Sequence, residues 1–113
     1  MFTPDSATLA KKWIALGLPW MPGMRLDSPD GWQRLCEDTL NKWEGWPDLT
    51  DPATLGCLLH QVREVCGDST IYVEFDQEWS VFGTSPPDFY GRGATEAEAL
   101  IAALETAKER GLI

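Results

Sequence analysis

The sequence predicts an α+β fold in which a small antiparallel sheet is packed by three helices. Three stretches place apolar residues three and four positions apart, as on one face of a helix. Other stretches alternate apolar and polar residues around turn residues, as in β-hairpins. The composition, with 43% hydrophobic and 24% charged residues, is that of an ordinary globular protein. A length of 113 residues suits one domain, so we expect a single domain over residues 1–113.

The helices are expected over residues 4–16, 52–66 and 95–110. The second has the clearest start, because Asp51 is a suitable cap and Pro52 fits the first helical position. The third opens with a capping-box pattern, Thr-Glu-Ala-Glu. The apolar stripe of the second helix is the widest and is almost purely aliphatic, which predicts that it is the central packing helix. That stripe contains Leu55, Leu58, Leu59, Val62, Val65 and Cys66.

A β-hairpin is expected over residues 70–82, because β-branched and aromatic residues alternate there on both sides of a turn. Asp76 and Gln77 are expected to form that turn. The stretch 83–93 is a candidate for a third strand.

The chain between the first two expected helices has a less regular pattern of apolar and polar residues. Residues 24–26 and 32–35 are expected to pair as a short hairpin around a turn at 27–31, which contains Asp, Ser, Pro and Gly. The stretch 37–49 is expected to be irregular or a short edge strand.

Charge narrows the class of partner. Eighteen acidic and nine basic residues give a formal net charge of -9 at pH 7. Direct binding of nucleic acid draws most of its affinity from Lys and Arg on phosphates, so we expect no direct nucleic-acid partner. An acidic surface instead suits a basic protein, including one that itself handles nucleic acid.

No cofactor, metal or catalytic constellation is expected. Cys57 and His60 have a spacing that suits two metal ligands on a helix, but no second pair with zinc-like spacing exists. His60 is the only histidine and has no paired nucleophile in the pattern. The run Gly91-Arg92-Gly93 is too short for a phosphate-binding loop. We therefore expect a protein that is not an enzyme.

The cell compartment is predicted from two features. No stretch reaches the eighteen or so apolar residues that a membrane-spanning helix needs, so no membrane partner is expected. The first residues lack the basic start and apolar run of a signal peptide, which predicts a location in the cytoplasm.

The candidate binding residues are aromatic, methionine and arginine side chains, because aromatic residues and Arg dominate protein contact sites. A loop over residues 20–25 holds three of them and is stiffened by proline and glycine. The alternative is that Trp20 and Met24 close the end of the core under the first helix. Three tryptophans are expected in irregular chain that is free to form a recognition surface: Trp32, Trp43 and Trp46. The candidates are Trp20, Met21, Arg25, Trp43, Trp46 and Arg92.

Three segments carry a resemblance to a known group of proteins. They are Trp-Met-Pro-Gly-Met at 20–24, Pro-Asp-Leu-Thr-Asp-Pro-Ala-Thr-Leu-Gly-Cys-Leu-Leu at 47–59 and Gly-Ala-Thr-Glu-Ala-Glu-Ala-Leu at 93–100. Together they resemble small proteins of unknown function common in phages and prophages. The layout is also similar to the phage α-β-α sandwich proteins, in which helices pack a small sheet. The resemblance implies a phage-type origin and brings no known activity.

The last forty residues separately resemble the strand-strand-strand-helix unit of HicB-like antitoxins. Thr95, Glu98, Ala99 and Leu100 fit that pattern. The chain departs from the family because no appended DNA-binding module is evident. A similar ending occurs in double-stranded-RNA-binding domains, but the basic residues that hold phosphates there are missing here.

These features support three hypotheses of function besides an enzyme. The first is a non-catalytic phage or prophage accessory protein that binds and blocks a host protein, as an anti-CRISPR-like inhibitor of a defence system does. The second is a small-ligand binder that sequesters a nucleotide immune signal, with a Trp stacking on the base and an Arg holding phosphate. The third is a HicB-like antitoxin. A homo-oligomer is compatible with these hypotheses, and in the second its ligand pockets would form between chains.

Overall fold

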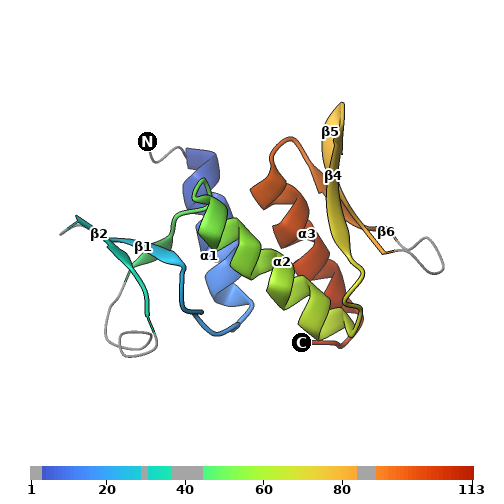
Figure 1. Cartoon of the computed structure of the whole chain (residues 1–113), viewed down its shortest axis with the longest axis horizontal. Coiled ribbons are helices and arrows are strands. Elements are labelled where there is room, and N and C mark those ends of the chain that lie inside the picture. The colour runs from blue at the N-terminus through green and yellow to red at the C-terminus, as the bar shows by residue number, and fades with distance from the viewer. Residues whose placement is uncertain (1–3, 29–30, 37–44, 84–88) are drawn as a thin grey trace. The chain divides into compact units, whose positions relative to one another are not determined.

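The computed structural model describes residues 4–28, 31–36, 45–83 and 89–113. The chain divides into two compact units, which we call the first unit, Met1–Cys57, and the second unit, Leu58–Ile113. The division falls inside a helix, and the single domain expected over the whole chain stays a prediction. The elements follow in the order α1 Pro4–Ala15, β1 Arg25–Ser28, β2 Gly31–Arg34, β3 Trp46–Pro47, α2 Pro52–Cys66, β4 Tyr72–Asp76, β5 Glu78–Phe82, β6 Phe89–Gly93 and α3 Glu96–Glu109 (Figure 1).

The three predicted helices are confirmed, to within a residue at most ends. The N-terminus of α2 is capped as expected, because the Asp51 carboxylate accepts a hydrogen bond from the Thr54 N–H at 3.0 Å. The N-terminus of α3 is capped by Thr95, whose hydroxyl accepts from the Glu98 N–H at 3.1 Å. The Glu98 carboxylate in turn accepts from the Ala94 N–H at 2.8 Å, which satisfies another donor before the helix.

The first unit contains an antiparallel sheet with the order β2-β1-β3. The predicted first hairpin is confirmed, although its turn is shorter than 27–31, because pairing continues to Ser28 opposite Gly31. The stretch 37–49 is expected to be irregular or a short edge strand; its residues 46–47 form the short edge strand β3, which pairs with the other side of β1, and residues 37–44 lie outside the described residues. On one face of this sheet Leu26 and Pro47 are buried, so that face belongs to the core of the unit.

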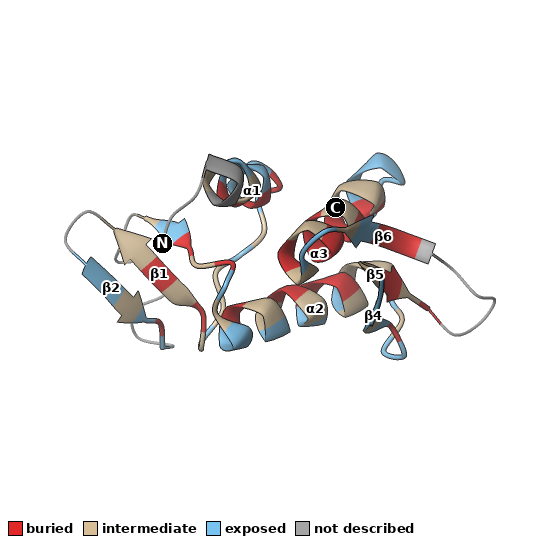
Figure 2. Ribbon diagram, turned by 90° about the horizontal axis from the view of Figure 1, so that it is seen from above, coloured by how far each residue is buried: buried red, intermediate tan, exposed pale blue. Residues whose placement is uncertain are grey.

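The second unit contains an antiparallel sheet with the order β4-β5-β6, and α3 packs against β5 and β6. The predicted hairpin and the third strand are therefore confirmed. The turn is tighter than expected: Asp76 pairs directly with Glu78, so Gln77 forms the tip with a φ of 64°. Figure 2 shows buried residues along α3, whereas β2 of the first unit is mostly exposed.

Close packing between β6 and α3 depends on glycine. A Cβ atom at Gly91 would lie 2.6 Å from both the Ala103 amide nitrogen and the Ala99 carbonyl oxygen. The strand therefore approaches the helix backbone to a distance that only glycine allows. Gly91 lies opposite Val81, which is fully buried, so this contact is at the centre of the second unit.

Over the described residues the predicted α+β class with antiparallel strands and three helices is confirmed, but the expectation of one small sheet requires correction, because the strands there form two sheets of three. The physical reason is local. Each hairpin takes its third strand from the chain that follows it, which costs less loop-closure entropy than joining two distant hairpins. Within the described part of the chain, no helix is long and apolar enough to cross a membrane.

Candidate functional site

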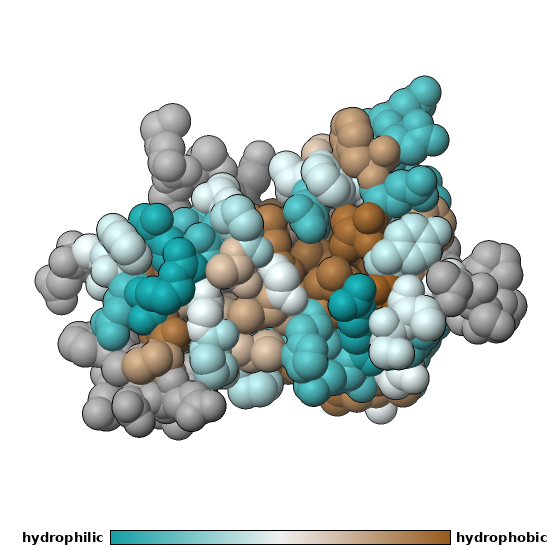
Figure 3. All heavy atoms as spheres, viewed as in Figure 1, coloured by the Kyte–Doolittle hydropathy of each residue, from teal (hydrophilic) through white to brown (hydrophobic). Residues whose placement is uncertain are grey.

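A hollow of about 400 Å³ lies on the outer face of the first sheet, opposite the face that buries Leu26. It belongs wholly to the first unit. Figure 3 shows hydrophilic residues, in teal, gathered over the part of the molecule where Figure 1 places β1 and β2. The residues that line the hollow are Arg25, Asp27, Ser28, Gly31, Trp32 and Trp46.

Strand register explains why two tryptophans share this face. Asp27 on β1 pairs with Trp32 on β2 and with Trp46 on β3. Directly paired residues of antiparallel strands point to the same face, so the two indoles flank one carboxylate. Trp32 is 60% exposed and Trp46 is 37% exposed. The hollow thus has aromatic walls that solvent reaches.

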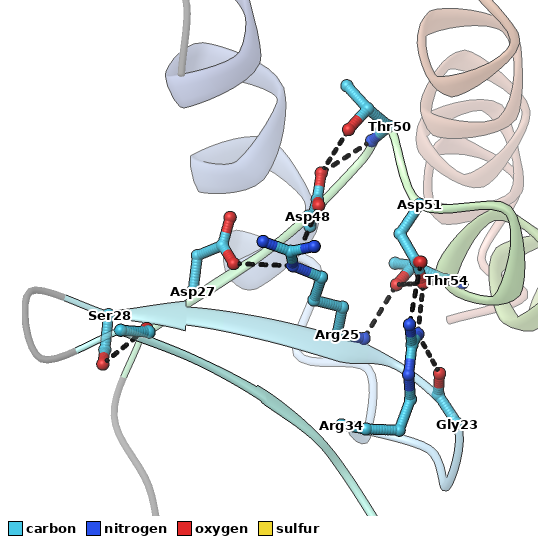
Figure 4. Close-up of polar contacts among 10 residues, drawn as sticks. Gly23, Arg25, Asp27, Ser28, Arg34, Asp48, Thr50, Asp51 and Thr54 are labelled. Atoms are coloured by element: carbon cyan, nitrogen blue, oxygen red, sulfur yellow. Dashed lines mark hydrogen bonds and ion pairs between the residues drawn. The ribbon is translucent and has the colours of Figure 1, made fainter. Parts of the chain in front are cut away.

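Arg25 lies two positions before Asp27 and therefore on the same face of β1. Its Nε is 3.1 Å from Asp27 Oδ1 and 3.2 Å from Asp48 Oδ2, as Figure 4 shows for the labelled side chains. Its guanidinium carbon lies 4.5 Å from the centre of the Trp32 ring, which is a cation–π distance. One positive charge sits between two negative ones, so this cluster has a net charge of about -1.

Asp48 is itself held in place. Its Oδ1 accepts hydrogen bonds from the Thr50 N–H at 3.0 Å and from the Thr50 hydroxyl at 2.6 Å. Its other oxygen is left to meet Arg25. The Arg25 main chain is also fixed, because its N–H donates to the buried Thr54 hydroxyl at 2.8 Å. Hydrogen bonds to Thr50 and Thr54 therefore hold the charged cluster in place.

The far end of β2 is fixed to the start of α2 by an ion pair between Arg34 and Asp51. The two guanidinium nitrogens of Arg34 each donate to one carboxylate oxygen, with Nη2 to Oδ1 at 3.0 Å. Arg34 also donates to the Gly23 carbonyl at 2.9 Å. The hydrogen bond from Arg34 lowers the pKa of Asp51 from 3.8 to about 2, with help from Thr54 and against the effect of partial burial. This pair supports the sheet that carries the hollow (Figure 4).

Among the predicted binding residues, the structure brings Arg25 and Trp46 together in the hollow. Trp20 instead packs edge-on against the buried Trp13, with ring centres 4.9 Å apart, and Met24 is fully buried. Both placements agree with the alternative in which this loop closes the core.

The other predicted binding residues do not line the hollow. Met21 lies in the same loop as Trp20, and its N–H contacts the Met24 sulfur at 3.2 Å. Arg92 is in the second unit, on β6, and lies 3.4 Å from Glu78. Trp43 lies outside the described residues.

Sequence reasoning missed the carboxylates of the hollow and did not commit to Trp32. The sequence pattern predicts Asp27 in a turn, whereas the structure places it on β1 opposite Trp32. The signal that identifies these residues is alternation: Arg25 and Asp27 are polar on either side of the apolar Leu26, as on a half-buried strand. Extending the hairpin by one pair then places Trp32 beside Asp27.

Cys57 and His60, which have the spacing of two metal ligands, lie on α2 outside the hollow. Burial raises the pKa of the Cys57 thiol, whose sulfur lies 3.6 Å from the Pro22 carbonyl oxygen. His60 is exposed and lies 2.9 Å from Glu64 on the next turn of the helix. Among the described residues, no three His, Cys, Asp or Glu side chains form a group that could hold a metal ion.

No family model, curated protein or solved structure matches this chain. The class of site is therefore defined by its own geometry: a shallow aromatic hollow with a fixed, slightly negative charge cluster. The chemistry available to such an arrangement is stacking on the indoles and ion pairing with the carboxylates.

Proposed function

We propose that this protein is a non-catalytic binding protein that docks on another protein through the hollow of the first unit. The observation that carries the proposal is the pair of exposed indoles, Trp32 and Trp46, on either side of Asp27. Tryptophan and arginine are the residues that most often dominate the binding energy of protein interfaces. Here both types lie together on one sheet face, where both indoles reach solvent.

Charge favours a basic partner. The chain has a net charge of -9, and the cluster formed by Arg25, Asp27 and Asp48 contributes to it. Complementary charge speeds the encounter and favours a partner with a positive surface. Combined with the resemblance to phage and prophage proteins, this supports a phage accessory protein that blocks a basic host protein in the host cytoplasm. A nucleic-acid-handling complex of a host defence system is one such target.

Two alternatives have narrower support. The volume of the hollow suits a small ligand, which favours a binder of a nucleotide signal. However, Arg25 is already engaged by two carboxylates, so a phosphate group would meet a negative field there. The antitoxin alternative rests on the order β4-β5-β6-α3 in the second unit, which is the order that the resemblance implies.

The proposal is tested by capturing partners from a bacterial host lysate at low salt with matched variants. Trp32→Ala and Trp46→Ala should each reduce capture of a specific host protein by about tenfold or more, as for residues that dominate an interface. Phe75→Ala in the second unit is the control, because Phe75 is also 60% exposed but lies outside the hollow. Equal capture by the wild-type protein and by all three variants would overturn the proposal. Thermal unfolding of each variant confirms that it is folded.

A further inference from the structure

We infer that the hollow receives an arginine side chain of the partner protein, with its guanidinium against the Trp46 indole, next to the stack of Arg25 on Trp32, and its charge on Asp27. This inference rests on the proposed function and names the chemistry that the site recognises. It follows from the position of Arg25, from the charge of the cluster and from the geometry of a guanidinium.

Arg25 demonstrates that a guanidinium fits this surface. Its side chain stacks on the Trp32 ring at 4.5 Å and bonds to the Asp27 carboxylate at 3.1 Å. Trp46 offers a second indole on the other flank of the same carboxylate. The hollow therefore has the two groups that hold a guanidinium, an aromatic face and an acidic acceptor. Arg25 occupies the Trp32 ring and one oxygen of Asp27.

The net negative charge of the cluster favours the approach of a second cation. Arg25 contacts Oδ1 of Asp27 and Oδ2 of Asp48, which leaves one negative charge in excess. The second oxygen of Asp48 faces away, toward the neighbouring threonine. The second oxygen of Asp27 points away from Arg25 (Figure 4). An incoming cation therefore meets the Asp27 carboxylate without removing Arg25 from Asp48.

A guanidinium suits the hollow better than an ammonium. It is planar and stacks on an indole, whereas the lysine ammonium is compact and strongly hydrated. It also presents paired N–H donors to a carboxylate. An anion would instead be repelled by the excess negative charge. Arg25→Gln consequently separates the two cases: it should strengthen binding of an arginine, because a competing charge is removed, and weaken binding of a phosphate.

The test uses the full chain labelled with ¹⁵N and short capped peptides, Gly-Gly-Arg-Gly-Gly and the same peptide with citrulline or lysine. The indole N–H signals of Trp32 and Trp46, assigned with Trp32→Phe and Trp46→Phe, report binding. We expect the arginine peptide to shift both signals in the millimolar range and the citrulline peptide to bind about threefold or more weakly. The Trp79 signal of the second unit is the internal control and should not move.

Two variants give the sign of the charge effect. Arg25→Gln should tighten arginine binding by about threefold, and Asp27→Asn should weaken it by about the same factor. The inference is overturned if citrulline or lysine binds as well as arginine. It is also overturned if inorganic phosphate shifts these signals and Arg25→Gln abolishes that shift. If the peptides fail while Trp32→Ala still loses the captured host protein, the occupant is wrong and the proposed function stands.

Discussion

The two units each contain a three-stranded antiparallel sheet, but they hold it together in different ways. In the first unit, side-chain ion pairs connect distant parts of the chain, as Arg34 does with Asp51 and Arg25 with Asp48. In the second unit, the sheet meets α3 almost backbone to backbone at Gly91.

The binding surface proposed above lies in the first unit, on the sheet face opposite Leu26. Its strands are short and fixed from their ends by polar contacts, and one sheet face carries the exposed side chains of Trp32 and Trp46. In the second unit, the face that carries Gly91 is closed by a helix. The stability of the first unit should therefore be sensitive to substitutions that remove a charge, and that of the second to substitutions that add volume. Three experiments test that contrast.

The largest effect is expected for Gly91→Ala. The added Cβ meets main-chain atoms of α3, which cannot turn aside as a side chain does, so strand and helix must separate. We expect a loss of about 3 kcal/mol in the free energy of unfolding. Urea unfolding followed by far-UV circular dichroism measures it.

Gly56→Ala is the matched control for this substitution. Gly56 lies in α2, and an added Cβ there meets nothing within 4 Å. Because alanine favours helix over glycine, this variant should gain about 0.5–1 kcal/mol. Equal destabilisation by both substitutions would contradict close packing at Gly91.

The next effect is expected in the first unit for Asp51→Ala. This substitution removes both the cap of α2 and the partner of Arg34, and should cost about 2 kcal/mol in the free energy of unfolding. Asp51→Asn keeps an oxygen for the cap and loses the charge, so it should cost about half as much. If Asn is as damaging as Ala, the ion pair rather than the cap supports the helix start.

The smallest effect is the pH dependence of the same group. The folded pKa of Asp51, about 2, lies below its ordinary value of 3.8, so the charged carboxylate stabilises the fold. This contribution is complete above about pH 5 and is lost as the pH falls through 3.8 toward 2, which should cost about 1 kcal/mol in a partly exposed pair.

The measurement is the difference between wild type and Asp51→Asn in urea unfolding at pH 7, 4 and 2.5. The difference is needed because hydrogen bonds from Thr70 also lower the pKa of Asp68, in the second unit, and add an acid loss of their own. We expect the gap between the two proteins to narrow as the pH falls. A constant gap would mean that the charge of Asp51 does not stabilise the fold.

Local patterns in the sequence were sufficient to predict the helices and both hairpins. The Asp51-Pro52 start and the Thr95 cap are confirmed, because a cap is decided by residues within one turn of each other. The sequence left open whether Trp20 in the 20–25 loop belongs to the core or to a binding surface, since an aromatic residue beside a helix suits either place. Contact with the buried Trp13 places Trp20 against the core side.

The sequence by itself determined the class of fold, the helix ends and the acidic character of the surface. Only the tertiary structure decided that the strands form two sheets and that Trp32, Asp27 and Trp46 lie side by side on one face. The physical reason is that strand register depends on hydrogen bonds between segments far apart in the chain. The approach of Gly91 to α3 is hidden for the same reason, because the neighbouring backbone that excludes a side chain lies outside any local pattern.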